Sequence, residues 1–195
     1  MKELVIASNN PGKLAEFQIL LAPLGINVLT QAQLGISEAE EPHFTFIENA
    51  LAKARHVSRL SGLPALADDS GICVHALNGM PGVISARYSG FPLSDERNNH
   101  TLLQAMQTHT DRRAHYACLL VLMRSAGDAQ PIIAEGEWHG EIALEPRGKG
   151  GFGYDPLFWL PELGKTSAEL TRDEKHAISH RGKAMQILLE RLQAI

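Results

Sequence analysis

Residues 4–21 read LVIASNNPGKLAEFQILL, and this segment sets the first unit of the fold. Leu4–Ala7 is an apolar run typical of a short buried strand, and the polar stretch Ser8–Lys13 follows it. Apolar side chains then recur at helical spacing, at positions 14, 17, 20 and 21. The segment therefore predicts a strand, a loop and a helix in that order.

The rest of the chain continues this mixture of strands and helices. Further strands are expected at 26–30, 64–67, 72–77, 114–123, 132–134, 138–142 and 157–160, with 114–123 as a buried central strand. Helices are expected from Thr45, which with Glu48 forms a capping signature, to about Leu60, from about Ser94 to Met106, and at the C-terminal end. The order predicts one α/β domain over residues 1–195, with a mixed, partly antiparallel twisted sheet flanked by helices.

Composition narrows the class of protein. The 195 residues include 18 Lys and Arg against 22 Asp and Glu, a net charge of −4, and 44% of them are hydrophobic. This is an ordinary globular composition, and a pI near 6.1 argues against a broad nucleic-acid-binding surface. No run approaches the roughly 18 apolar residues of a membrane span, and no signal peptide is recognised. We expect a cytoplasmic protein with no nucleic-acid or membrane partner, and with Cys73 and Cys118 as buried thiols.

The polar loop Ser8, Asn9, Asn10, Pro11, Gly12 and Lys13 joins a strand to a helix N-terminus. Unpaired backbone N–H groups and the helix dipole favour an anion there, and Lys13 adds a full positive charge. A phosphate site is one interpretation, although the Walker A pattern is absent. A plain capped helix start is the other.

Two acidic clusters are candidates for a metal site. Asp68 and Asp69 are expected at the end of a strand, where adjacent carboxylates repel unless a cation or a proton is shared. Glu38–Glu41 forms a second cluster in a loop. Oxygen ligands of this kind suit Mg²⁺, but an Asx turn and a solvated loop explain the same residues.

The expected helix from Thr45 carries a polar stripe. Asn49, Lys53 and His56 share one side of it. This stripe is a candidate to face a cleft.

Two later segments offer contacts to a nucleobase. Residues 150–155 read GGFGYD, and Phe152 and Tyr154 serve there either to stack on a base or to anchor the core. Residues 175–181 read KHAISHR and supply hydrogen-bond donors, with Ser179 as the expected N-cap of the last helix. His176 and His180 have metal-ligand spacing, but no third ligand follows, so zinc is disfavoured.

In this order, these segments resemble the family of non-canonical purine NTP pyrophosphatases of the Ham1 and RdgB type. The resemblance covers nearly the whole chain. The matching stretches are 8–13, 45–54, 67–71, 81–82 with 85–88, 151–156 and 179–182. Two departures are small: Pro11 stiffens the first loop, and Tyr154 stands where some relatives carry Trp.

The resemblance implies an elongated, two-lobed fold around a central cleft, shared with Maf-type proteins. It also implies Mg²⁺-dependent cleavage of ITP, dITP and XTP between the α and β phosphates. The products would be the nucleoside monophosphate and pyrophosphate, removed before incorporation into DNA or RNA. A homodimer is the expected assembly.

The same resemblance assigns residues to roles. Lys13 and Lys53 would hold the triphosphate, helped by the loop 8–12 and Ser70. Glu40 and Asp69 would position Mg²⁺, with Asp68 and Glu41 as further candidates, and Asp69 would also deprotonate the attacking water. Phe152 would stack on the base, and the remaining base-pocket residues would be Gly153, Tyr154, Asp155, Lys175, Ser179, His180 and Arg181.

Two alternatives stay open. A Maf-type pyrophosphatase acts on other nucleotides, including pyrimidine ones, although segments 152–155 and 179–181 argue against it. A nucleotide sensor would bind without catalysis and would tolerate loss of the acidic clusters. Pyrophosphate release from purine and pyrimidine triphosphates, each with and without Mg²⁺, separates the three.

Overall fold

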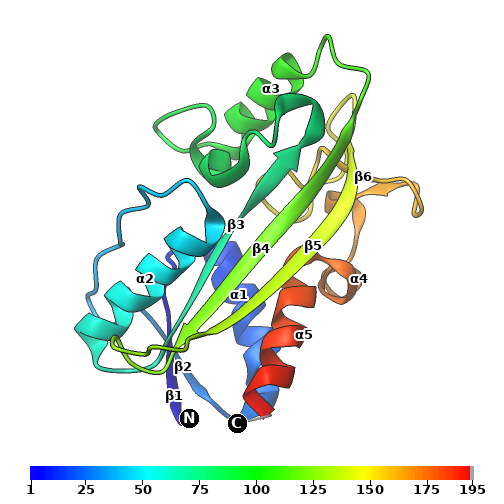
Figure 1. The fold of residues 1–195 in the computed structure, drawn as a ribbon. Coiled ribbons are helices and arrows are strands. Elements are labelled where there is room, and N and C mark those ends of the chain that lie inside the picture. The colour runs from blue at the N-terminus through cyan, green and yellow to red at the C-terminus, as the bar shows by residue number, and fades with distance from the viewer. Residues whose placement is uncertain (194–195) are drawn as a thin grey trace. The chain divides into compact units, whose positions relative to one another are not determined.

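The computed structural model describes residues 1–193, and its strands form a seven-stranded sheet in the order β2-β1-β3-β4-β5-β6-β7 (Figure 1). The strands are β1 (Glu3–Ile6), β2 (Asn27–Thr30), β3 (Ala65–Val74), β4 (Arg113–Met123), β5 (Ile132–Ile142), β6 (Phe158–Leu160) and β7 (Lys165–Thr166). β1 pairs in parallel with β2 and β3, whereas β6 pairs antiparallel with β5 and β7. The expected mixed, partly antiparallel α/β fold is therefore confirmed, and β4 is the buried central strand.

The helices are α1 (Pro11–Leu21), α2 (Phe46–Ser61), α3 (Asp95–Ala105), α4 (Arg172–Ile178) and α5 (His180–Gln193). Short 3₁₀ helices lie at Ala22–Leu24, His75–Leu77, Gly82–Arg87 and Ser167–Glu169. Thr45 caps α2 and Ser94 caps α3, each accepting a hydrogen bond from the N–H group three residues later. Both helix starts agree with the sequence expectation.

The chain folds as two compact units, each assembled from segments that are distant in sequence. Unit 1 contains residues 1–69 and 118–135 with the segment from Ala184 onward, and unit 2 contains 70–117 and 136–183. The boundary passes through β3, β4 and β5. The single domain over 1–195 and the two-lobed shape stay predictions.

Unit 1 packs helices on both faces of its strands (Figure 1). Leu4, Ile6 and Leu66 face the core shared with α1 and α5, whereas Val5 and Ala65 face α2. Side chains of a strand alternate between the two faces, so Asp68 lies on the side of Leu66, toward α1, and Asp69 lies on the side of Ala65, toward α2. This alternation decides where the two aspartates point.

Two expectations about strands are wrong. The sequence pattern predicts two strands, at 64–67 and 72–77, with a turn between them, but β3 runs unbroken through Asp68 and Asp69. The strand continues because partly buried lysines pair with both carboxylates, and local sequence does not show such partners. The expected strands 132–134 and 138–142 are likewise the single strand β5.

Two short elements escaped the sequence analysis. β7 has two residues and α4 has seven, so neither is long enough to show a hydrophobic period. Thr171 caps α4 through a reciprocal capping box with Glu174. The capping box of Thr171 and Glu174 is therefore the sequence feature that could have predicted α4.

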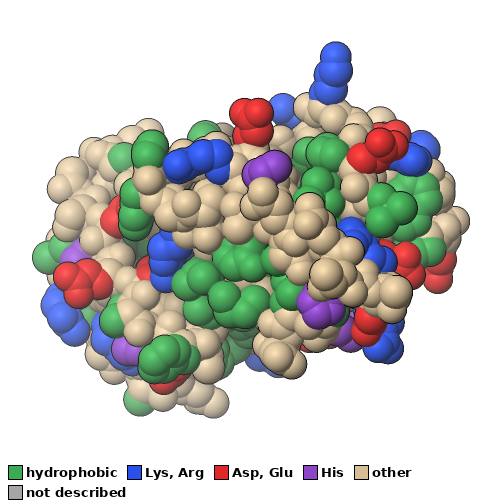
Figure 2. Space-filling view, turned by 90° about the horizontal axis from the view of Figure 1, so that it is seen from above, with side chains coloured by type: hydrophobic (Ala, Val, Ile, Leu, Met, Phe, Trp, Pro, Cys, Tyr) green, Lys and Arg blue, Asp and Glu red, His purple; other side chains and the backbone are tan. Residues whose placement is uncertain are grey.

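The distribution of charged side chains on the surface agrees with the small net charge of −4. On the face drawn in Figure 2, basic and acidic side chains are interspersed rather than gathered into one basic field. Within residues 1–193, no helix is both long and apolar enough to cross a membrane.

Candidate active site

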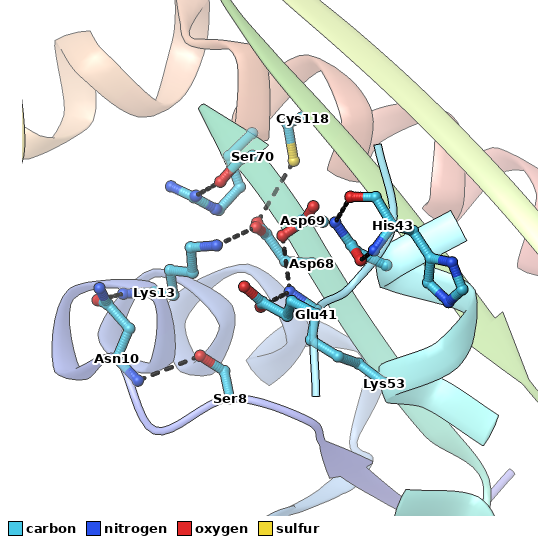
Figure 3. A network of polar contacts seen from close by, with 12 residues as sticks. Ser8, Asn10, Lys13, Glu41, His43, Lys53, Asp68, Asp69, Ser70 and Cys118 are labelled. Carbon is cyan, nitrogen blue, oxygen red and sulfur yellow. Dashed lines mark hydrogen bonds and ion pairs between the residues drawn. The ribbon is translucent and has the colours of Figure 1, made fainter. Parts of the chain in front are cut away.

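The loop at residues 8–13 is a capped helix start that brings Lys13 to the sheet. The Asn10 side chain accepts from the Lys13 N–H at 3.0 Å, and Ser8 Oγ accepts from the Asn10 N–H at 3.2 Å (Figure 3). Pro11 occupies the first helical position, where its missing N–H costs nothing. The capped helix start is confirmed. The phosphate site stays a prediction.

Lys13 reaches the first aspartate of β3. Its Nζ donates to Asp68 Oδ1 at 2.5 Å, and the Cys118 thiol donates to Asp68 Oδ2 at 3.4 Å (Figure 3). The Asp68 side chain is fully buried, so the adjacent ammonium offsets the cost of burying its charge. Within residues 1–193 neither cysteine forms a disulfide; Cys118 is buried, as expected, whereas Cys73 is only partly buried.

The second aspartate has a different lysine. Lys53 Nζ donates to Asp69 Oδ1 at 2.8 Å and to Glu41 Oε1 at 2.9 Å (Figure 3). Asp69 Oδ2 is buried and has no hydrogen-bond partner within residues 1–193. The repulsion expected between Asp68 and Asp69 is thus relieved by separate lysines on opposite faces of β3.

Burial and charge act in opposite directions on this pair. Burial raises the pKa of Asp69, although the positive charges of Lys53 and Lys13 oppose the shift. Burial lowers the pKa of Lys53, but attraction to Asp69 and Glu41 outweighs it and the net shift is upward. Asp69 is therefore a stronger base than an ordinary aspartate, while Lys53 stays charged.

The polar stripe of α2 holds the acidic loop. The buried Asn49 amide accepts from the His43 N–H at 3.1 Å and donates to the His43 carbonyl at 3.2 Å. His56 Nε2 lies 3.0 Å from the Ser37 carbonyl oxygen, and Lys53 binds the loop carboxylate. The stripe predicted from the sequence, Asn49, Lys53 and His56, therefore faces this loop.

The carboxylates are suited to a divalent cation that also binds phosphate. Glu40 is exposed, and its neighbour Glu41 is the loop carboxylate that reaches Lys53. Across residues 1–193, no group of three or more His, Cys, Asp or Glu side chains is arranged to hold a metal. Mg²⁺ commonly takes one or two carboxylates and completes its shell with phosphate oxygens and water. The unpartnered Asp69 Oδ2, a hard oxygen donor, fits that requirement.

The glycine-rich loop of unit 2 is organised around Asp155. This buried carboxylate accepts from the Phe152 N–H at 2.9 Å, from Lys175 Nζ at 2.5 Å and from Ser167 Oγ at 2.8 Å. Lys175 Nζ lies 4.9 Å from the centre of the Phe152 ring, and the Arg181 guanidinium lies 5.9 Å from it. Phe152 is thus a half-buried ring with two cations in contact.

Tyr154 and His180 are more deeply buried than Phe152. Tyr154 is 3% exposed and its hydroxyl donates to the Ser85 carbonyl at 2.8 Å, so the core-anchor interpretation holds for this residue. The His180 ring stacks on Tyr116 with 4.6 Å between centroids and 8° between planes. Stacking on a base would therefore fall to Phe152.

The start of α5 brings the remaining residues into place. Ser179 Oγ accepts from the Gly182 N–H at 3.1 Å, which confirms the expected N-cap. A Cβ at Gly182 would overlap the His176 carbonyl oxygen, so this position requires glycine. Arg181 donates to Ser70 Oγ at 3.0 Å.

The fold and these two clusters are typical of an α/β nucleotide-binding protein: lysine–carboxylate pairs suited to phosphates and Mg²⁺ lie in unit 1, and a cation-flanked aromatic ring lies in unit 2. The chain belongs to the Ham1 family, whose model matches residues 4–191. This finding confirms the resemblance seen in the sequence.

Individual relatives match over almost their full length. The dITP/XTP pyrophosphatase of Ralstonia nicotianae is 65% identical and covers 99% of this chain and 98% of its own. That of Nitrosomonas europaea is also 65% identical, covering 98% and 95%. The solved structure of a HAM1 protein from Coxiella burnetii has a TM-score of 0.94 and 47% identity over 100% of both chains. The Staphylococcus aureus Ham1 protein has a TM-score of 0.89 and 40% identity over 99% of both.

Proposed function

We propose that this chain is a Mg²⁺-dependent pyrophosphatase that hydrolyses dITP, ITP and XTP to the nucleoside monophosphate and pyrophosphate. The observation that carries the proposal is Asp69, a buried carboxylate of raised pKa with one oxygen unpartnered, held beside Lys53. The relatives named dITP/XTP pyrophosphatase support the substrate class.

Lys13 and Lys53 bind the triphosphate in this proposal. Each ammonium group already pairs with a carboxylate, and its positive charge can also stabilise the negative charge of a phosphate. Phosphoanhydride cleavage requires mainly positioning and charge neutralisation, which two lysines and a divalent cation supply. No covalent nucleophile is required.

Asp69 acts as the general base. It accepts a proton from the water whose oxygen attacks the α phosphorus, while the bond from that phosphorus to the bridging oxygen breaks and pyrophosphate leaves. Glu40 and Asp69 would hold Mg²⁺, with Asp68 and Glu41 as further candidates. When bound, Mg²⁺ neutralises charge on the phosphate oxygens.

The cluster of Phe152, His180 and Arg181 in unit 2 recognises the base. Phe152 stacks on the purine, and Arg181 or His180 donates to the 6-oxo group of hypoxanthine or xanthine. Adenine presents an amino donor there, which would leave a buried cation without an acceptor. Guanine shares the 6-oxo group, so its exclusion requires a pocket without an acceptor for the 2-amino group.

A pyrophosphate-release assay on dITP, ITP, XTP, ATP, GTP, dTTP and UTP tests this function. We expect turnover mainly of the first three, and only when Mg²⁺ is present rather than a chelator. Preference for dTTP or UTP would indicate the Maf-type activity. Binding of every nucleotide without turnover would indicate a sensor.

The rate should depend on pH through Asp69. Because the base must be deprotonated, kcat/KM for dITP should fall as the pH decreases through the Asp69 pKa, which lies above the usual aspartate value of about 3.9. Lys53→Met removes a charge that lowers this pKa, so the acid limb should move to higher pH. Lys2→Met, the same change at an exposed lysine of unit 1, should leave the limb in place. An unmoved limb in Lys53→Met would exclude Asp69 as the group that sets it.

The proposed setting is a cytoplasmic homodimer acting on free nucleotides, with no nucleic-acid or membrane partner. Light scattering coupled to gel filtration should give twice the chain mass of 21.3 kDa. A single peak at the chain mass would contradict the dimer.

A further inference from the structure

Helix α3 holds the glycine that follows the ring of Phe152. Asp95 Oδ2 accepts from the Gly153 N–H at 2.7 Å, and Asn99 Nδ2 donates to the Gly153 carbonyl oxygen at 2.8 Å. These contacts span 58 and 54 residues of sequence. Asp95 and Asn99 are one helical turn apart, so one face of α3 holds both polar groups of Gly153.

The orientation of the Asn99 amide is defined by its neighbours. Its Nδ2 donates to two carbonyl oxygens, those of Asp95 and Gly153, both at 2.8 Å. The opposite orientation would place the amide oxygen against two acceptors. Asn99 is 8% exposed, so water does little to replace these bonds.

The peptide groups on both sides of Phe152 are therefore held. Asp155 accepts from the N–H group of Phe152, and Asp95 accepts from that of Gly153. Without these bonds the backbone would be mobile, because Gly151 and Gly153 both have positive φ angles, 73° and 62°. One of these bonds comes from within the loop, and the other comes from α3.

We infer that Asp95 and Asn99 are positioning residues for base selection, acting through Gly153 on the orientation of Phe152. The inference rests on the proposed function, in which Phe152 stacks on the purine. It gives a role to α3, a helix to which the proposed mechanism assigns none. Neither residue is a catalytic residue, since each acts through the loop.

The test compares binding of a substrate that has a base with binding of a phosphate ligand that has none. In Asp95→Ala and Asn99→Ala, KM for ITP should rise about tenfold, the effect of one lost hydrogen bond. The inhibition constant of inorganic tripolyphosphate should stay within about twofold of wild type, because that ligand lacks a base. Asp95→Asn keeps an acceptor for the Gly153 N–H and should retain most of the wild-type KM.

Asn98→Ala is the matched control. It removes a buried amide from the same helix, but that amide bonds Ser89 and Ala86 instead of Gly153. It should lower the melting temperature without changing the ratio of the ITP KM to the tripolyphosphate inhibition constant. Equal weakening of both ligands in Asn99→Ala, or an unchanged KM, would overturn the inference.

Hydrogen exchange supplies a measurement that does not depend on turnover. Exchange of the Gly153 amide should accelerate in Asp95→Ala and not in Asn98→Ala, because only the former removes its acceptor. Equal exchange in both variants would reject the positioning role even if the wild type hydrolysed no ITP. Absent ITP turnover with faster exchange would reject the proposed function and leave the contact with α3 established.

Discussion

Asp69→Asn should reduce kcat for dITP by about 10²- to 10⁴-fold, the usual contribution of a general base. The substitution keeps the side-chain shape and retains an oxygen for Lys53 Nζ, which now lies 2.8 Å from Asp69 Oδ1. It removes the proton acceptor and a negative oxygen suited to Mg²⁺. Steady-state pyrophosphate release at saturating Mg²⁺ measures the loss.

Folding should survive this change. Burial already disfavours the charged form of Asp69, as its raised pKa shows, so a neutral amide is tolerated there. Glu190→Gln, the same change at an exposed position of α5, is the control and should keep wild-type kcat. Turnover of Asp69→Asn near the wild-type rate would assign the base to another group.

Lys175→Met should destabilise the protein by about 3–5 kcal/mol, the usual cost of removing one partner of a buried ion pair. Lys175 Nζ lies 2.5 Å from Asp155 Oδ2, and both side chains are at least nine-tenths buried. Without the ammonium, Asp155 would be a buried carboxylate that keeps hydrogen bonds from Ser167 Oγ and the Phe152 N–H but has lost its adjacent positive charge. For a chain of this length the melting temperature should fall by about 10 °C or more, as calorimetry would show.

The double variant Lys175→Met with Asp155→Asn isolates the electrostatic cause. Removing both charges leaves no unpaired ion, so much of the lost stability should return. Lys165→Met, the same change at an exposed lysine, should shift the melting temperature by less than about 2 °C. A double variant no more stable than Lys175→Met would show that packing, and not charge, explains the loss.

Local sequence patterns were sufficient for the parts of the fold and site that depend on neighbours along the chain. The Thr45 cap of α2, the Ser94 cap of α3 and the Ser179 cap of α5 each join residues three apart. The apolar run of β4 predicted a buried strand without knowledge of its partners. These features are visible because helix capping and hydrophobic periodicity act over a few residues.

The continuity of β3 was not predictable from the same patterns. Asp68 and Asp69 looked like a turn, because two carboxylates inside a buried strand are unfavourable unless each has a partner. Those partners, Lys13 and Lys53, lie 55 and 16 residues away. Only the packed helices α1 and α2 bring them to the two faces of the strand.

The sequence alone established the α/β class, the caps at Thr45, Ser94 and Ser179, and a set of candidate residues that resembles one nucleotide pyrophosphatase family. The tertiary structure decided which of these residues meet: Glu41 contacts Lys53, Tyr154 packs in the core, and α3 holds Gly153. The physical reason is range. Hydrophobic periodicity and helix capping depend on residues within a few positions of one another in the sequence. The pairing of charges and the positioning of loops depend on distant segments, which only sheet formation and helix packing bring together.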